Sequence, residues 1–300
     1  MTEAQPPLLS GLVAAAFTPM DASGSLDLER VPAVCDFVLG QGVSALFLCG
    51  TTGEGPSLSV SERRAVTEAY LAAAAGRVPI VVQVGHNSLA EARELARHAQ
   101  DSGAAAIAMV PPSYFPVRSV SALAECLQDI GRAAPQTPLY YYHIPNLSGV
   151  GLRVPQLLDE MDALVPSFAG VKFSSLELDD LSRCVRHGDG RYNILFGSDE
   201  MLLAGLAMGA AGAVGSTYNF MGPEFSAVLE AFERGDMRAA QAHQGVATDL
   251  IHKILRHGGH DALKAAMAIR GVDCGPPRLP CKPLSQEAFA SLEQDLGHGR

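Results

Sequence analysis

Residues 168–174 have the sequence Phe-Ala-Gly-Val-Lys-Phe-Ser, a short apolar run that contains a single lysine and is bounded by serines. A run of this length and composition is typical of a buried β-strand. Because successive side chains of a strand point to opposite faces, Lys172 is expected on one face with Gly170. Ala169, Val171 and Phe173 are expected on the opposite face. The apolar face suits a covering helix, so Lys172 is expected to point away from the helices.

Seven further runs of the same kind occur along the chain, and stretches with apolar residues at helical three- and four-residue spacing lie between them. The predicted strands are residues 11–18, 44–50, 79–85, 105–111, 138–144, 168–174, 193–197 and 212–217. The clearest predicted helices are residues 28–39, 62–75, 89–99 and 120–133, with Asp27 and Ser61 as expected N-caps. This alternation predicts an α/β protein with the fold of a (β/α)8 TIM barrel.

The predicted barrel covers residues 1–222, and residues 223–300 are expected to form a C-terminal helical extension docked on it. No strand signal follows Met221, and a Gly- and Pro-rich segment at 271–283 interrupts the helical pattern. A doubly wound sheet is the alternative, because periodicity alone does not show that the sheet closes. In a barrel the functional side chains lie at the carboxyl ends of the strands, so the residues that end the predicted strands are the candidates.

The composition and charge of the 300-residue chain favour a small-molecule partner. With 48% hydrophobic residues the chain can bury a large core, and a net charge of −10 without a basic block disfavours nucleic acid and anionic membranes. The sequence has no uninterrupted apolar run of about 18 residues, and residues 1–10 lack the features of a signal peptide. The six scattered cysteines form no Cys-x-x-Cys pair, so we expect a cytoplasmic protein with reduced thiols.

Lysine is rare in this chain. Only four of the 22 basic residues are lysines, namely Lys172, Lys253, Lys264 and Lys282, and the others are arginines. A buried amine can lose its proton, which a guanidinium cannot, and the neutral amine is a nucleophile that forms a Schiff base with a ketone. Lys172 is therefore the candidate nucleophile, and a lysine paired with a barrel carboxylate is the alternative. The other three lysines are expected to be solvated.

Other strand ends carry groups that could assist this chemistry. Tyr142 lies near the end of the strand predicted at 138–144, where its phenol could transfer a proton, with core packing as the alternative. The segment Gly-Thr-Thr-Gly-Glu-Gly at 50–55 offers hydroxyl and N–H groups for a carboxylate, without the sequence of a phosphate-binding P-loop. The acidic and hydroxyl groups at 197–200 and 215–217 could bind a polyol or cap helices.

In order and along nearly the whole chain, these motifs resemble the pyruvate-dependent class I aldolases that include dihydrodipicolinate synthase and N-acetylneuraminate lyase. Dihydrodipicolinate synthases usually carry an arginine two residues after the Tyr-x-x-Pro motif, and Leu147 occupies that position here, as in sialic-acid lyases. The resemblance therefore implies reversible cleavage of N-acetylneuraminate to N-acetylmannosamine and pyruvate. The matching motifs are LVAA at 12–15, TPM at 18–20, GTTGE at 50–54, LSVSERR at 58–64, YYYHIP at 140–145, GVKF at 170–173, GSDE at 197–200, GSTYN at 215–219 and GPPRLP at 275–280.

The resemblance also implies roles for individual residues. Lys172 would form the Schiff base with C2 of the open-chain substrate, without a separate cofactor, and Tyr142 would take the proton of the C4 hydroxyl. Thr51 and Thr52 would hold the substrate carboxylate, and Thr52 would also relay protons with Tyr142. Tyr114 would reach across a subunit interface, which implies a homotetramer built as a dimer of dimers. The residues that would bind the polyol are Gly197, Asp199, Glu200, Gly215 and Ser216.

Three other functions are left open by the residues themselves. A sister aldolase or dehydratase for another 2-keto-3-deoxy acid would use the same Lys172 and Tyr142, since the Schiff base involves only the pyruvate half. A barrel that binds sugar acids without turnover would release no pyruvate. A metal-dependent barrel enzyme would pair Lys172 with a carboxylate, but His257 and His260 lack a partner at the spacing typical of zinc sites, so no metal is predicted.

Overall fold

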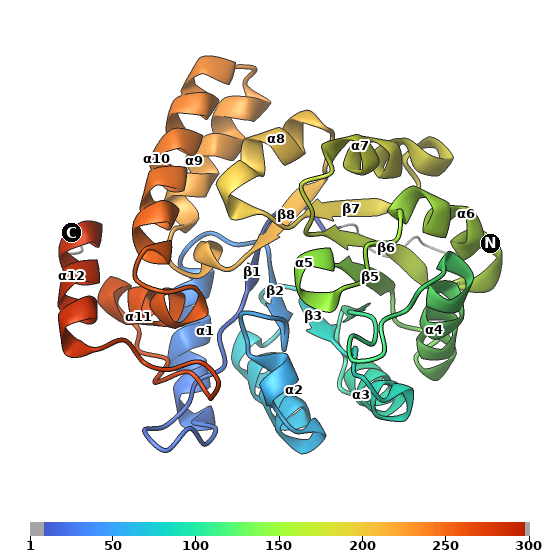
Figure 1. The fold of residues 1–300 in the computed structure, drawn as a ribbon, viewed down its shortest axis with the longest axis horizontal. Helices are drawn as coiled ribbons and strands as arrows, with labels where there is room; N and C mark the ends of the chain where they lie inside the picture. Colours follow the sequence, from blue (N-terminus) through green and yellow to red (C-terminus); the bar gives the residue numbers. More distant parts are fainter. Residues whose placement is uncertain (1–8, 298–300) are drawn as a thin grey trace.

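Eight parallel strands pair with their neighbours in chain order and close into a barrel (Figure 1). The computed structural model describes residues 9–297. The strands are β1 (Gly11–Ala15), β2 (Ala45–Leu48), β3 (Ile80–Gln83), β4 (Ala106–Met109), β5 (Leu139–His143), β6 (Phe168–Phe173), β7 (Asn193–Phe196) and β8 (Gly212–Gly215). Each predicted run contains one of these strands, and the TIM barrel is confirmed. The doubly wound alternative is wrong, because β1 pairs with β8 and leaves the sheet without an edge.

Helices lie between successive strands and also follow the last strand, β8 (Figure 1). They are α1 (Val31–Leu39), α2 (Val60–Ala74), α3 (Leu89–Asp101), α4 (Val120–Ala133), α5 (Pro145–Ser148), α6 (Val154–Leu164), α7 (Leu178–Arg186), α8 (Leu202–Ala207), α9 (Gly222–Glu233), α10 (Met237–Leu255), α11 (His260–Arg270) and α12 (Gln286–Leu296). Helix α9 packs against β1 and α8, in the place of the helix that follows the eighth strand. The predicted boundary after residue 222 falls within its first turn and stays a prediction.

The beginning of α2 corrects one detail of the sequence interpretation. Ser59, and not Ser61, is the N-cap: its Oγ accepts the N–H of Glu62 at 3.2 Å, and Glu62 Oε2 accepts the N–H of Ser59 at 2.8 Å. This reciprocal pair satisfies two N–H groups that a helix start otherwise leaves without a partner. Asp27 precedes a 3-10 turn and makes no capping bond with its side chain.

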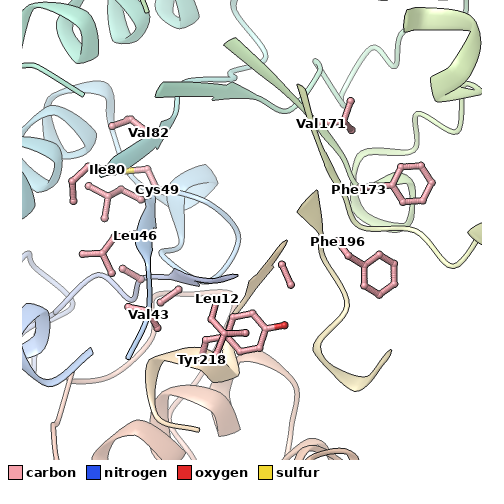
Figure 2. Packing of buried hydrophobic residues seen from close by; sticks show 14 of the residues in the cluster. Leu12, Val43, Leu46, Cys49, Ile80, Val82, Val171, Phe173, Phe196 and Tyr218 are labelled. Atoms are coloured by element: carbon pink, nitrogen blue, oxygen red, sulfur yellow. The ribbon is translucent and has the colours of Figure 1, made fainter. Parts of the chain in front are cut away.

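Alternation along the strands divides the buried apolar side chains into two sets. The larger set lies between the strands and the helices, and Figure 2 shows Phe173 of β6 beside Phe196 of β7 in this layer. The smaller set fills the barrel interior and includes Phe47 and Tyr142. Lys172 projects into this interior, as predicted, and is paired in register with Tyr142 of β5.

At Gly170 the backbone of β6 comes close to that of β7. A matched pair of glycine-to-alanine variants tests this close approach. A Cβ atom at this position would lie 1.9 Å from the carbonyl oxygen of Asn193, whereas nothing lies within 4 Å of the corresponding atom at the exposed Gly245 of α10. We expect Gly170→Ala to lower the free energy of unfolding by about 1–3 kcal/mol, because a strand carbonyl cannot move aside. Gly245→Ala should raise it by about 0.5–1 kcal/mol, because alanine favours helix. Chemical denaturation measures both changes, and equal stabilities would contradict the close approach.

Candidate active site

Lys172 lies inside the barrel with its amine against two aromatic rings. Its Nζ is 4.1 Å from the ring centroid of Phe47 and 4.0 Å from that of Tyr142, and only 4% of the residue is exposed. Among residues 9–297 no carboxylate oxygen lies within 4.0 Å of this amine, unlike that of Lys264, which forms a close ion pair. The alternative of a lysine paired with a barrel carboxylate is therefore wrong, and the amine is free to meet a carbonyl group.

The loop between β2 and α2 brings two threonine hydroxyls to the same end of the barrel. Thr51 Oγ1 lies 3.4 Å from the phenol oxygen of Tyr142, and Thr52 Oγ1 lies 2.6 Å from Ser216 Oγ. The sequence interpretation paired Thr52 with Tyr142, whereas the structure places Thr51 there. Strand β5, the β2 loop and the end of β8 thus meet, and their hydroxyl groups form two separate pairs.

Asp199 follows β7 and is buried beside the end of β8. Its Oδ2 accepts the backbone N–H of Thr217 at 2.9 Å and the hydroxyl of Thr217 at 2.6 Å. Burial raises the pKa of Asp199 to about 6, although the two bonds from Thr217 and the positive charge of Lys172 act in the opposite direction. A Cβ atom at Gly215 would lie 2.1 Å from Asp199 Oδ1, so only glycine leaves room for the carboxylate there.

A cavity of about 320 Å³ opens where the strands β6, β7 and β8 end. Gly197, Asp199, Glu200 and Ser216, four of the five predicted polyol residues, line it, and so does Leu147. Three apolar residues of the C-terminal helices α10 and α11 also line it, namely Ile251, Leu255 and Leu263. The extension therefore forms part of the candidate site.

Ser174 is a site residue that the sequence interpretation missed. It lines the cavity, and its Oγ is buried without a hydrogen-bond partner among the described residues. A Cβ atom at Gly197 would lie 1.9 Å from this Oγ, so the glycine makes room for the hydroxyl. The signal was present in the sequence, since Ser174 comes two residues after Lys172 and strand alternation puts both on one side.

Tyr114 is not brought to the site by its own chain. It lies in the loop between β4 and α4, 80% exposed, beside Phe115, which is 83% exposed. Asn87 fixes this loop, because its Oδ1 accepts the N–H groups of Ser113 at 2.9 Å and of Tyr114 at 3.0 Å. The backbone of this loop is thus fixed, while the side chain of Tyr114 is exposed.

Among the histidines and lysines of the extension, one lysine differs from the environment that the sequence predicted. Lys264 is 2% exposed and forms an ion pair with Glu54 at 2.8 Å, so the expectation of a solvated charge is wrong for this residue. His257 Nε2 lies 2.8 Å from a carboxylate oxygen of Asp295, and His260 Nε2 lies 3.6 Å from Glu54. Within residues 9–297 no three His, Cys, Asp or Glu side chains are arranged to hold a metal ion.

Asp199→Asn tests the burial of this carboxyl group through the pH dependence of stability. The pKa is about 6 in the folded chain and about 3.9 when unfolded, so the group contributes stability below pH 4 that is lost as the pH rises through 6. Relative to Asp199→Asn, the wild type should lose on the order of 1–3 kcal/mol between about pH 4 and pH 8. Denaturation at both pH values measures this, with the exposed Glu287→Gln as control. A difference that does not vary with pH would contradict the assignment.

Several known proteins share the sequence pattern and the fold of this chain. The N-acetylneuraminate lyase of Rattus norvegicus is 42% identical over 293 residues, which cover 96% of this chain and 92% of that protein. The solved N-acetylneuraminate lyase (sialic acid aldolase) of Aliivibrio salmonicida has a TM-score of 0.94 at 38% identity and covers 97% of this chain and 96% of its own. That of Proteus mirabilis has a TM-score of 0.93 at 35% identity, over 97% and 98%. The chain matches the Dihydrodipicolinate synthetase family over residues 8–298 and belongs to that family.

Proposed function

We propose that this protein is a Schiff-base lyase that reversibly cleaves N-acetylneuraminate to N-acetylmannosamine and pyruvate. The observation that carries this proposal is the buried amine of Lys172, which has no described carboxylate within 4.0 Å and lies against the ring of Tyr142. Leu147 at the cavity wall and relatives that are named N-acetylneuraminate lyase favour this substrate over that of a sister enzyme.

The proposed chemistry uses the Schiff base as the electron sink, so no separate cofactor is required. Lys172 Nζ attacks C2 of the open-chain sugar acid, and loss of water gives the protonated imine. Tyr142 then passes its own phenol proton through the Thr51 hydroxyl to the substrate carboxylate as it takes the proton of the C4 hydroxyl. The C3–C4 bond breaks, which releases the aldehyde of N-acetylmannosamine and leaves an enamine on Lys172. Protonation of the enamine at C3 and hydrolysis release pyruvate and restore the amine.

The remaining site residues bind the two ends of the substrate in this proposal. Thr51, Thr52 and the neighbouring N–H groups of their loop hold the carboxylate, and the contact of Thr51 with Tyr142 makes Thr51 the better candidate for a proton relay. Ser174 adds a hydroxyl without a described partner to the cavity. The polyol tail is bound by Gly197, Asp199, Glu200, Gly215 and Ser216.

A homotetramer built as a dimer of dimers is the assembly that we propose. The support is the exposed pair of Tyr114 and Phe115, whose rings pack edge to face at 5.1 Å on a loop held by Asn87. A large aromatic pair of this exposure is typical of a surface that another subunit covers. Sedimentation velocity of the whole chain measures the assembly, and a monomer at micromolar concentration would contradict it.

A cytoplasmic location is also a proposal. Its support is that all six cysteines are free and that most of them are buried. Within residues 9–297 no helix combines the length and the apolar character that a bilayer span needs. Fractionation of the cells that produce the protein, with an antibody against the chain, measures its location, and recovery in an oxidising compartment would contradict the proposal.

Pyruvate release from N-acetylneuraminate tests the proposed reaction. Coupled oxidation of NADH by lactate dehydrogenase should report turnover by the wild type and none by Lys172→Ala or Lys172→Arg, because neither replacement offers a neutral amine. Lys282→Ala, at an exposed lysine of the extension, is the matched control and should keep full activity. Activity in Lys172→Arg would contradict the Schiff base.

The other functions predict different results in the same assay. Faster release from a shorter 2-keto-3-deoxy acid would favour a sister aldolase, and binding of the sugar acid without any release would favour a non-catalytic barrel. Loss of activity with a chelator, together with activity in Lys172→Ala, would favour a metal-dependent enzyme.

Tyr142→Phe separates Schiff-base formation from cleavage. The variant keeps the aromatic ring beside the amine, so borohydride should still trap pyruvate on Lys172. Cleavage of N-acetylneuraminate should be about 10²- to 10⁴-fold slower, because the proton of the C4 hydroxyl has lost its acceptor. Mass spectrometry of the trapped protein and the coupled assay measure the two steps, and unchanged cleavage would remove Tyr142 from this role.

A further inference from the structure

A buried ion pair joins the loop after β2 to the C-terminal helices. Lys264 Nζ in α11 donates to Glu54 Oε1 at 2.8 Å and to the carbonyl oxygen of Pro276 at 3.0 Å. The other carboxylate oxygen of Glu54 accepts the backbone N–H of Arg278 at 2.7 Å. Glu54 is 6% and Lys264 is 2% exposed. Three contacts from the extension therefore fix the carboxylate and its counter-ion in a site with little access to water.

Glu54 lies in the same loop as the two threonines of the candidate site. It follows Thr52 by two residues, and its φ of 55° lies in the left-handed region, which is unfavourable for a side chain with a Cβ atom. On the barrel side the loop is held by Thr18, whose hydroxyl donates to the carbonyl oxygen of Gly53 at 2.6 Å. On the outer side it is held by the ion pair, so the loop is fixed between the barrel and α11.

A second ion pair extends this attachment to α2. The guanidinium of Arg278 donates to both carboxylate oxygens of Glu62, at 2.8 and 2.5 Å, and to the carbonyl oxygen of Ser57 at 3.1 Å. Burial alone would raise the pKa of Glu54, but its neighbours lower it to about 2. His260 Nε2, at 3.6 Å, is beyond hydrogen-bond distance, so we assign the lowering to Lys264 and the N–H of Arg278. The carboxylate is thus ionised at neutral pH.

We propose that Lys264 is a positioning residue for the carboxylate-binding loop of the active site. Its ion pair with Glu54 fixes the loop so that Thr51 stays beside Tyr142 and Thr52 beside Ser216. The inference rests on the proposed function, in which these hydroxyls hold the substrate carboxylate. A role in stability alone explains the pair less well, because a buried ion pair adds little net stability compared with apolar side chains of similar volume. Its directional bonds, in contrast, determine geometry.

Binding of pyruvate by the whole chain tests this role. The adduct that borohydride traps on Lys172 is measured by mass spectrometry as a function of pyruvate concentration for Lys264→Met. We expect half-saturation at a roughly 10- to 100-fold higher concentration, because a small misplacement of binding groups weakens a site by that order. Lys282→Met, at an exposed lysine of the same extension, should match the wild type. Unchanged half-saturation in Lys264→Met would overturn the proposal.

A double-variant cycle distinguishes positioning from a general loss of stability. If Lys264 acts through the loop hydroxyls, Lys264→Met in a Thr52→Val background should weaken binding far less than it does alone. Full additivity of the two losses would overturn the proposal. If Lys264→Met alone folds poorly, the double variant Glu54→Gln with Lys264→Met is used in its place, because it leaves no unpaired charge. In that variant weak pyruvate binding supports positioning, and normal binding overturns it.

The design also separates this inference from the proposed function. Because pyruvate is the probe, a wrong choice of sugar acid leaves the measurement valid. If the wild type forms no adduct with pyruvate, the proposed function fails. Hydrogen exchange of the backbone amides of residues 50–55 then tests whether Lys264 fixes this loop. Faster exchange in Lys264→Met than in Lys282→Met would support the role of Lys264, and equal exchange would overturn it.

Discussion

The contact of the Lys172 amine with the rings of Phe47 and Tyr142, inside a closed barrel, is the interaction on which the candidate chemistry depends. Burying a charged group costs several kcal/mol unless other interactions compensate for it. Contact of a cation with each aromatic face offsets about 0.5–2 kcal/mol of this cost. No described carboxylate within 4.0 Å takes this compensating role, so the amine is not committed to an ion pair. The closed sheet makes this possible, because it provides an interior lined by apolar and aromatic side chains.

Two polar side chains that line the cavity depend on glycines that permit close contact. Gly197 leaves room for the hydroxyl of Ser174, and Gly215 leaves room for the carboxylate of Asp199. In both cases an added methyl group would overlap a polar atom, so the glycine and its polar neighbour form one unit. In the motifs at the ends of β7 and β8, the glycines are therefore required for steric reasons, in addition to the polar groups that these motifs supply.

The C-terminal helices belong to the site as much as the barrel does. Helices α10 and α11 supply the apolar wall of the cavity, and Lys264 of α11 fixes the loop that carries Thr51 and Thr52. A boundary after residue 222 would divide the chain, but residues on both sides of this boundary contribute to the candidate site. Arg278, in the segment between α11 and α12, also binds this loop, because its backbone N–H donates to Glu54.

The sequence by itself determined the eight strands, the side of β6 from which Lys172 projects and the strand ends at which polar groups gather. These features follow from side-chain alternation and turn residues, which act over a few positions and are visible locally. Only the tertiary structure decided that Thr51 rather than Thr52 meets Tyr142, that Ser174 Oγ has no hydrogen-bond partner within residues 9–297 and that Lys264 is buried against Glu54. Glu54 and Lys264 are 210 positions apart in the chain. Local periodicity carries no information on such a pair, because the contact depends on how α11 packs over the barrel.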